Sequence, residues 1–132
     1  MNILADTHIL YWFFNSDPQL SEKAKRILAD ENNTVYYSVL SMWEIAIKHK
    51  IGKMNFSGTE FMHYCEQAGF KKLPFDDRHV VALETLEKKP ETPPHNDPFD
   101  QGLLAQAKAD CMMLLSHDHK FVYYDEPYIT IV

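Results

Sequence analysis

Carboxylates in apolar surroundings are the residues of this chain best suited to carry chemistry. Most of its 19 acidic residues are expected to be solvated surface charges. Burying a lone carboxylate costs several kcal/mol unless the group is paired or bound to a metal ion. Four acids nevertheless adjoin apolar residues whose burial is predicted: Asp6, Glu44, Asp100 and Asp118. These four are therefore the first candidates for a functional site.

Asp6 and Asp118 each follow a short apolar segment that is typical of a strand. Residues 3–5 precede Asp6, and residues 112–115 precede the sequence Ser116-His117-Asp118. In parallel α/β sheets, ligands bind at the carboxyl ends of the strands. The alternative is that each aspartate caps the helix or turn that follows it. For Asp6, position alone favours neither interpretation.

Glu44 lies on a helix predicted over residues 38–51. At 100° per residue, the carboxylate falls within about 60° of three apolar residues, which are Leu40, Ile47 and Ile51. The alternative is a pair with Lys48 at i+4, worth a few tenths of a kcal/mol on an exposed helix. Because that pair does not explain the apolar neighbours, a functional role is favoured.

Asp97 and Asp100 stand at the start of a helix predicted to run to about residue 110. Asp97 is suited to be the N-cap, since Pro98 then takes the first helical position. Asp100 could be the acid of a capping box. It shares a face, however, with Leu103, Leu104, Ala107 and Cys111, which should pack on the sheet. Asp97 is therefore predicted to be the cap and Asp100 a ligand.

Carboxylates that converge repel one another unless a cation neutralises them. Oxygen ligands with open positions suit Mg²⁺ or Mn²⁺, which keep several water molecules and bind phosphate oxygens. The pattern is typical of metal-assisted phosphodiester cleavage, in which a metal-activated water attacks phosphorus. Seven histidines also raise the question of zinc, but their spacing matches no standard zinc signature.

The elements that must position these residues alternate between strands and helices. Strands or extended segments are expected at residues 3–5, 34–37, 72–75, 112–115 and 128–132, and helices at 20–29, 38–51, 59–68, 76–88 and 97–110. The prolines of residues 89–96 predict a loop. This order indicates an α/β fold with a mostly parallel sheet.

Composition limits the class of protein. With 45% apolar and 13% aromatic residues, the 132-residue chain can bury a core, so we expect one folded domain over residues 1–132. No apolar run reaches the roughly 18 residues of a membrane span. Two cysteines and no secretory signal predict a cytoplasmic location without a disulfide framework. The formal charge of −6 excludes nucleic-acid binding by bulk positive charge.

Five segments together resemble the PIN-domain ribonucleases, and within them most closely the VapC-type toxins of bacterial type II toxin–antitoxin pairs. The segments are residues 3–8, 41–48 with Gly52-Lys53, 95–100, 104–107 and 114–118. Their order and spacing cover essentially the whole chain. The most specific parts are Trp43-Glu44 and the motif Asp97-Pro98-Phe99-Asp100.

The resemblance implies a three-layer α/β/α sandwich and a function. The family's four acids fall on Asp6, Glu44, Asp100 and Asp118, while Asp97 supports the metal site. It implies an endoribonuclease that depends on Mg²⁺ or Mn²⁺ and acts on RNA such as tRNA or other structured RNA. It also implies a homodimer and a cognate antitoxin.

Residues near the acids are further candidates for contacts with substrate. Lys48 and Lys53 are candidates to contact the RNA backbone, or they form a solvated face. Thr7 and Ser116 are candidates to bind substrate or water, or they cap local turns. The position after the third acid is usually arginine in the family, and here it is Gln101. This departure supports the alternative of a weakly catalytic PIN domain that binds RNA or protein.

Overall fold

The computed structural model describes residues 1–132. A parallel sheet forms the centre of the molecule. Its strands lie in the order β3-β2-β1-β4-β5, and each neighbouring pair is parallel. Their bounds are β1 Asn2–Ala5, β2 Thr34–Ser38, β3 Lys71–Leu73, β4 Met113–Ser116 and β5 Ile129–Ile131. The predicted parallel α/β sheet is confirmed.

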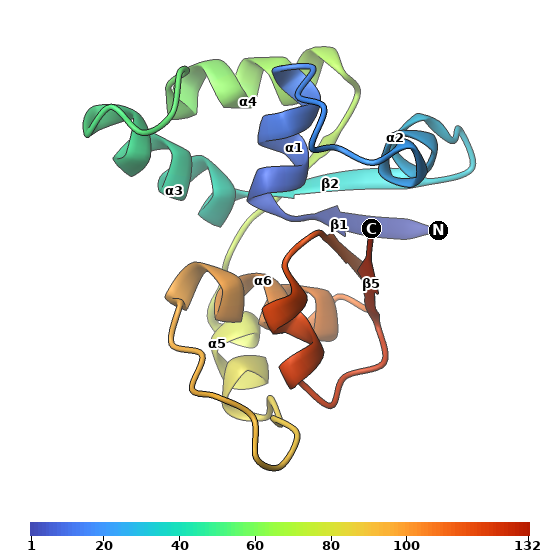
Figure 1. Ribbon diagram of the computed structural model, residues 1–132, viewed down its shortest axis with the longest axis vertical. Helices are drawn as coiled ribbons and strands as arrows, with labels where there is room; N and C mark the ends of the chain where they lie inside the picture. The colour runs from blue at the N-terminus through green and yellow to red at the C-terminus, as the bar shows by residue number, and fades with distance from the viewer.

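Helices cover both faces of the sheet (Figure 1). One layer holds α1 Thr7–Phe14, α2 Glu22–Ala29, α3 Val39–Lys50 and α4 Gly58–Gln67. The other holds α5 Asp77–Glu84, α6 Pro98–Ala109 and the 3-10 helix η1 His119–Tyr123. Because successive side chains of a strand point to opposite faces, Ile3 and Ala5 pack in the first layer's core and Leu4 in the second's. The predicted three-layer sandwich is thus present.

The order of the strands creates a crevice at the centre of the sheet. From β1 the chain proceeds to β2 and β3 on one side, and it then returns to place β4 and β5 on the other side of β1. Such a switch point leaves a crevice at the carboxyl ends of the two central strands. Ala5 of β1 and Leu115 of β4 are register partners. The residues that follow them therefore begin side by side.

One predicted boundary is wrong by several residues. The helix expected over residues 76–88 ends at Glu84. Beyond it, the chain extends and pairs with a distant segment, since Asp125 N–H donates to the Glu87 carbonyl (2.8 Å) and Lys89 N–H to the Tyr123 carbonyl (2.7 Å). Val80, an apolar residue of this helix, is exposed. Pairing with a remote segment has overridden the local helical pattern.

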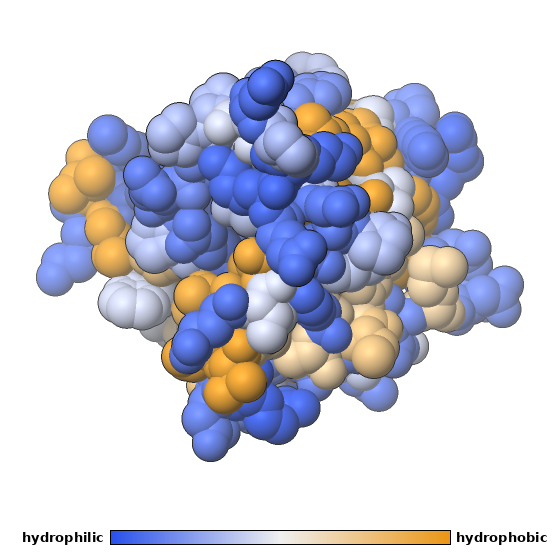
Figure 2. All heavy atoms as spheres, turned by 90° about the horizontal axis from the view of Figure 1, so that it is seen from below, coloured by the Kyte–Doolittle hydropathy of each residue, from blue (hydrophilic) through white to orange (hydrophobic).

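The surface seen from the side of α5 and α6 is mixed (Figure 2). Hydrophobic residues reach it in separate groups among hydrophilic ones. Both cysteines are free, with Cys65 buried and Cys111 exposed. No helix combines the length and the apolar character that crossing a membrane requires.

Candidate active site

The central crevice places Asp6 beside Asp118. Asp6 follows β1, and its N–H donates to the Leu115 carbonyl at 2.9 Å, which continues the β1–β4 pairing. The fully buried Ser116 ends β4. Its hydroxyl donates to Asp6 Oδ2 at 2.5 Å and accepts the N–H of Asp118 at 3.0 Å. One serine thus fixes the carboxyl of Asp6 and the backbone of Asp118.

Glu44 approaches this crevice from α3. Its residue is 6% exposed, so the burial predicted from the apolar stripe is confirmed. The alternative also holds, since Lys48 Nζ lies 2.7 Å from Glu44 Oε2. Helix α3 is held against α1 by the hydrogen bond between the hydroxyls of Thr7 and Ser41, which are 2.8 Å apart. The Lys48–Glu44 pair is partly buried, since the Glu44 side chain is enclosed while about a third of the Lys48 side chain is exposed.

Asp97 and Asp100 approach from the start of α6. Asp97 Oδ1 accepts the N–H groups of Phe99 (2.9 Å) and Asp100 (3.1 Å), so its predicted role as N-cap is confirmed. Asp100 Oδ2 lies 3.0 Å from His95 Nε2, and His95 Nδ1 lies 3.1 Å from the Tyr124 hydroxyl. Asp100 is thus held by a buried histidine whose other nitrogen is also engaged.

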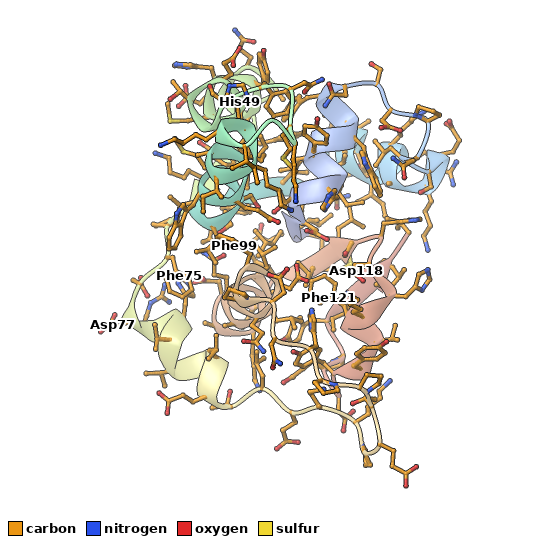
Figure 3. All side chains as sticks on the ribbon, turned by 60° about the vertical axis from the view of Figure 1, so that its left-hand side comes forward. His49, Phe75, Asp77, Phe99, Asp118 and Phe121 are labelled. Carbon is orange, nitrogen blue, oxygen red and sulfur yellow. The ribbon has the colours of Figure 1, made fainter.

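A glycine allows α6 to lie close to α3. A Cβ at Gly102 would come within 2.4 Å of Leu40 Cδ1 on α3. Glycine weakens a helix, but at this position it leaves room for the Leu40 side chain of α3. In Figure 3, Phe99 at the start of α6 and Asp118 before η1 lie near the junction of the two layers, whereas Asp77 lies at the outer end of α5.

The electrostatics show that the acids act on one another. Burial and, after it, the nearby charges of Asp6, Asp97, Asp118 and Glu44 together raise the pKa of Asp100 to about 8. Burial also raises the pKa of Asp6. The hydrogen bond from Ser116 and the charge of His8 lower this pKa, and the charge of Glu44 raises it, so that the pKa stays above its ordinary value. The five predicted acids therefore share one region, and they favour binding of a proton or a cation there.

The chemistry of these donors fits a hard divalent ion. No three His, Cys, Asp or Glu side chains are arranged to hold one ion in direct contact. Mg²⁺ commonly uses one or two carboxylates and completes its shell with water and substrate phosphate. A cavity of about 500 Å³ beside the acids is lined in part by Asp6 and Asp118, and it has room for such water molecules.

Comparisons with known proteins agree with this architecture. A model of the PIN domain matches residues 3–127. The chain belongs to the PIN domain family. No curated protein matches its sequence.

Several solved structures resemble this PIN domain. They include VapBC2 from Rickettsia felis bound to a DNA fragment from the promoter, with a TM-score of 0.73 and 17% identity over 99% of this chain and 98% of that chain. DNA-bound VapBC from Salmonella typhimurium has a TM-score of 0.67 and 13% identity over 99% and 98% of the two chains. FitAcB from Neisseria gonorrhoeae has a TM-score of 0.58 and 20% identity over 92% and 91%. At these identities the likeness is one of fold.

The other predicted site residues are two hydroxyl residues and two lysines, and they differ in burial and in their partners. The hydroxyls of Thr7 and Ser116 are buried and already bonded to Ser41 and Asp6, so their contact with substrate stays a prediction. Lys48 is paired with Glu44, whereas Lys53 is exposed. Contact of the two lysines with the RNA backbone stays a prediction.

Two features of this PIN domain escaped prediction from the sequence. His95 is a buried neighbour of Asp100, but a lone histidine in a proline-rich loop has no periodic pattern to indicate burial. Gln101 donates its Nε2–H to the His95 carbonyl at 2.7 Å. The residue at the usual arginine position thus anchors the loop that carries His95. The only available signal was their closeness in sequence to the Asp97–Asp100 motif.

Proposed function

We propose that this PIN domain, a single domain over residues 1–132, is an endoribonuclease that depends on Mg²⁺ or Mn²⁺. PIN domains are generally nucleases. The observation that carries the metal-dependent assignment is the cavity that Asp6 and Asp118 line at the carboxyl ends of β1 and β4, beside Asp100, whose pKa is raised by burial and by four neighbouring acids. Such a cluster disfavours its own full ionisation, and a divalent cation relieves the repulsion while displacing the proton.

The proposal gives each residue a role. Asp6, Glu44, Asp100 and Asp118 would hold the ion, and Asp97 caps α6 so that Asp100 faces the crevice. When bound, the ion supplies an activated water and neutralises charge on the phosphate.

Other residues of the chain hold these acids in place. The Ser116 hydroxyl fixes Asp6, Lys48 fixes Glu44, and His95 fixes Asp100. Such supporting contacts reduce the motion of ligands and adjust their basicity.

We propose further that the protein is the toxin of a type II toxin–antitoxin pair and forms a homodimer. Its fold extends over nearly the whole length of the similar chains from VapBC and FitAcB structures. A negative crevice without metal also favours a basic side chain from an antitoxin. The substrate would be RNA, such as tRNA or another structured RNA.

Cleavage of RNA by the purified protein tests the proposal. We expect cleavage with Mg²⁺ or Mn²⁺, none with EDTA, and none from D6N or D100N. D77N is the matched control, because Asp77 is exposed at the start of α5. Metal-independent cleavage, or full activity of D100N, would contradict the proposal.

The alternative function is a PIN domain that binds RNA or protein with little cleavage. It is favoured by Gln101, whose neutral side chain is used to hold the His95 carbonyl and offers no charge to a phosphate. Metal binding and RNA binding without cleavage in the same assay would support this alternative.

A further inference from the structure

A cavity of about 470 Å³ lies between the end of α1 and the helix α4, both at the top of Figure 1. We call it the α1–α4 cavity. Besides one alanine, its lining consists of three aromatic rings and three side-chain amides: Phe14, Phe56, Tyr64, Asn15, Asn55 and Gln67. None of these residues is charged, although 24% of the chain is. The volume is within the range of ligand pockets, and the lining suits an uncharged ligand with polar edges.

The aromatic rings of the α1–α4 cavity contact one another. The centroid of the Tyr64 ring is 5.7 Å from that of Phe14 and 5.3 Å from that of Phe56. Phe56 is buried and stacks on Phe61, whereas Phe14 and Tyr64 are half-buried. The core therefore holds the rings in place, while part of Phe14 and of Tyr64 stays accessible. Nucleobases stack on such rings, because every base has a flat π-face.

An asparagine is fixed beside these rings. The N–H of Asn55 donates to the Tyr11 hydroxyl at 3.2 Å, and its Nδ2 donates to Asn15 Oδ1 at 2.7 Å. Asn15 is fixed in turn, since its Nδ2 donates to the Tyr11 carbonyl at 2.8 Å. These bonds leave Asn55 with its Oδ1 acceptor and one Nδ2 hydrogen. The Asn55 amide can therefore offer a ligand both a donor and an acceptor at a fixed place.

We propose that the α1–α4 cavity binds an adenine ring, stacked on Tyr64 and held at its edge by the Asn55 amide. Adenine presents the N7 acceptor beside the N6 amino donor, and an asparagine amide pairs with both. No cation lines the cavity, so the base is recognised and a phosphate is not. The eight residues of α1, roughly 12 Å of helix, separate Phe14 from Asp6. The site is therefore distinct from the acidic crevice and goes beyond the proposed nuclease.

Side-chain amide signals in ¹H–¹⁵N NMR spectra of the full chain provide a direct readout. The probe is adenosine, added in EDTA so that no metal ion contributes. We expect the Asn15 and Asn55 signals to shift and to saturate with a dissociation constant on the order of 100 µM. AMP should bind as adenosine does. Ribose and uridine should cause shifts only at concentrations at least about tenfold higher, because neither presents the adenine edge.

Variants separate the two contacts. N55A should weaken adenosine binding about 5- to 150-fold, the range for loss of a bidentate amide–adenine pair. Y64L should weaken it by a similar factor through loss of one stack, while Y64F should retain most of the affinity. N32A is the matched control, because Asn32 is an exposed asparagine before β2 that does not line the cavity. Thermal unfolding of each variant verifies that it is folded.

The outcomes decide the inference independently of the nuclease. Absence of shifts with every adenine compound, equal binding of ribose, or unchanged affinity of N55A would overturn it, and Asn55 would then only anchor its loop to α1. Shifts with adenosine support a site for a free nucleoside or nucleotide. Shifts with a 2′-O-methyl oligoadenylate but not with adenosine support an adenine presented by an RNA strand. D100N should bind adenosine as the wild type does even where it has lost RNA cleavage.

Discussion

Replacing Asp100 by asparagine should stabilise the metal-free protein at neutral pH. The folded pKa of Asp100 is about 8, whereas the ordinary value is 3.8. The folded state therefore keeps a proton that the unfolded chain loses. One pKa unit corresponds to about 1.4 kcal/mol, so at pH 7 this difference costs the wild type up to about 4 kcal/mol of folding free energy. Asparagine keeps the shape and an acceptor oxygen for His95 but carries no charge.

The sign of the effect sets its pH window. Below about pH 4, Asp100 is protonated in both states and contributes no destabilisation. As the pH rises from about 4 toward 8, only the unfolded state releases the proton, so the stability of the wild type falls over this range. Above the folded pKa, both states are ionised and the loss stops growing. D100N lacks this contribution, so the gap between the two proteins should widen toward pH 8.

Urea unfolding in EDTA between pH 5 and pH 8.5 measures this difference. D77N is the control for removal of a solvent-exposed carboxylate. We expect D100N to exceed the wild type by about 1–4 kcal/mol at pH 7, and D77N to stay within about 0.5 kcal/mol. Mg²⁺ should stabilise the wild type, because it binds the folded state, and should stabilise D100N much less. Parallel pH profiles of wild type and D100N would refute the reasoning.

Three further substitutions test how the site is held together. S116A removes the hydroxyl that fixes the acids after β1 and β4, and Mn²⁺ affinity measured by calorimetry should fall about 10- to 100-fold. G102A should change the free energy of unfolding in urea by less than about 1 kcal/mol, because the added Cβ meets only the end of the Leu40 side chain, which can move aside, and alanine favours the helix. K48M leaves the buried carboxylate of Glu44 without its partner and should lower the free energy of unfolding in EDTA by about 1–3 kcal/mol. Mg²⁺ should restore part of this loss. A loss of only about 0.3 kcal/mol would mean that the pair behaves as a surface ion pair.

Local patterns were sufficient for the fold and for most of the acids. The alternation of apolar strands with amphipathic helices predicts a parallel sheet, because each strand must cross over to its neighbour. Glu44 could be recognised because its apolar neighbours recur at helical spacing. Asp97 could be recognised because a following proline marks the first position of a helix. For both residues, the sequence pattern that identifies them lies within a few positions of the residue itself.

The parts that could not be predicted depend on contacts between distant segments. His95 meets Tyr124, which is 29 positions away, and the end of α5 depends on pairing with residues 123–125. Gly102 appears only as a weak point of its helix until α3 is placed against it. Nor does the sequence show that Asn55 and Tyr64 border one cavity, since this depends on where α4 lies relative to α1.

The acidic crevice is a local conflict within an otherwise consistent fold. The topology brings the carboxyl ends of β1 and β4 together, and α3 and α6 then add acids to a region that is already negative and partly buried. A neutral residue in place of Asp100 would make the metal-free folded state more stable at neutral pH. Conflicts of this kind in natural proteins concentrate at functional sites, where a ligand resolves them. Buried Ser116 and His95 hold Asp6 and Asp100 in place without a full positive charge, and Lys48 offsets the charge of Glu44 alone. The repulsion that remains is what a divalent cation would relieve.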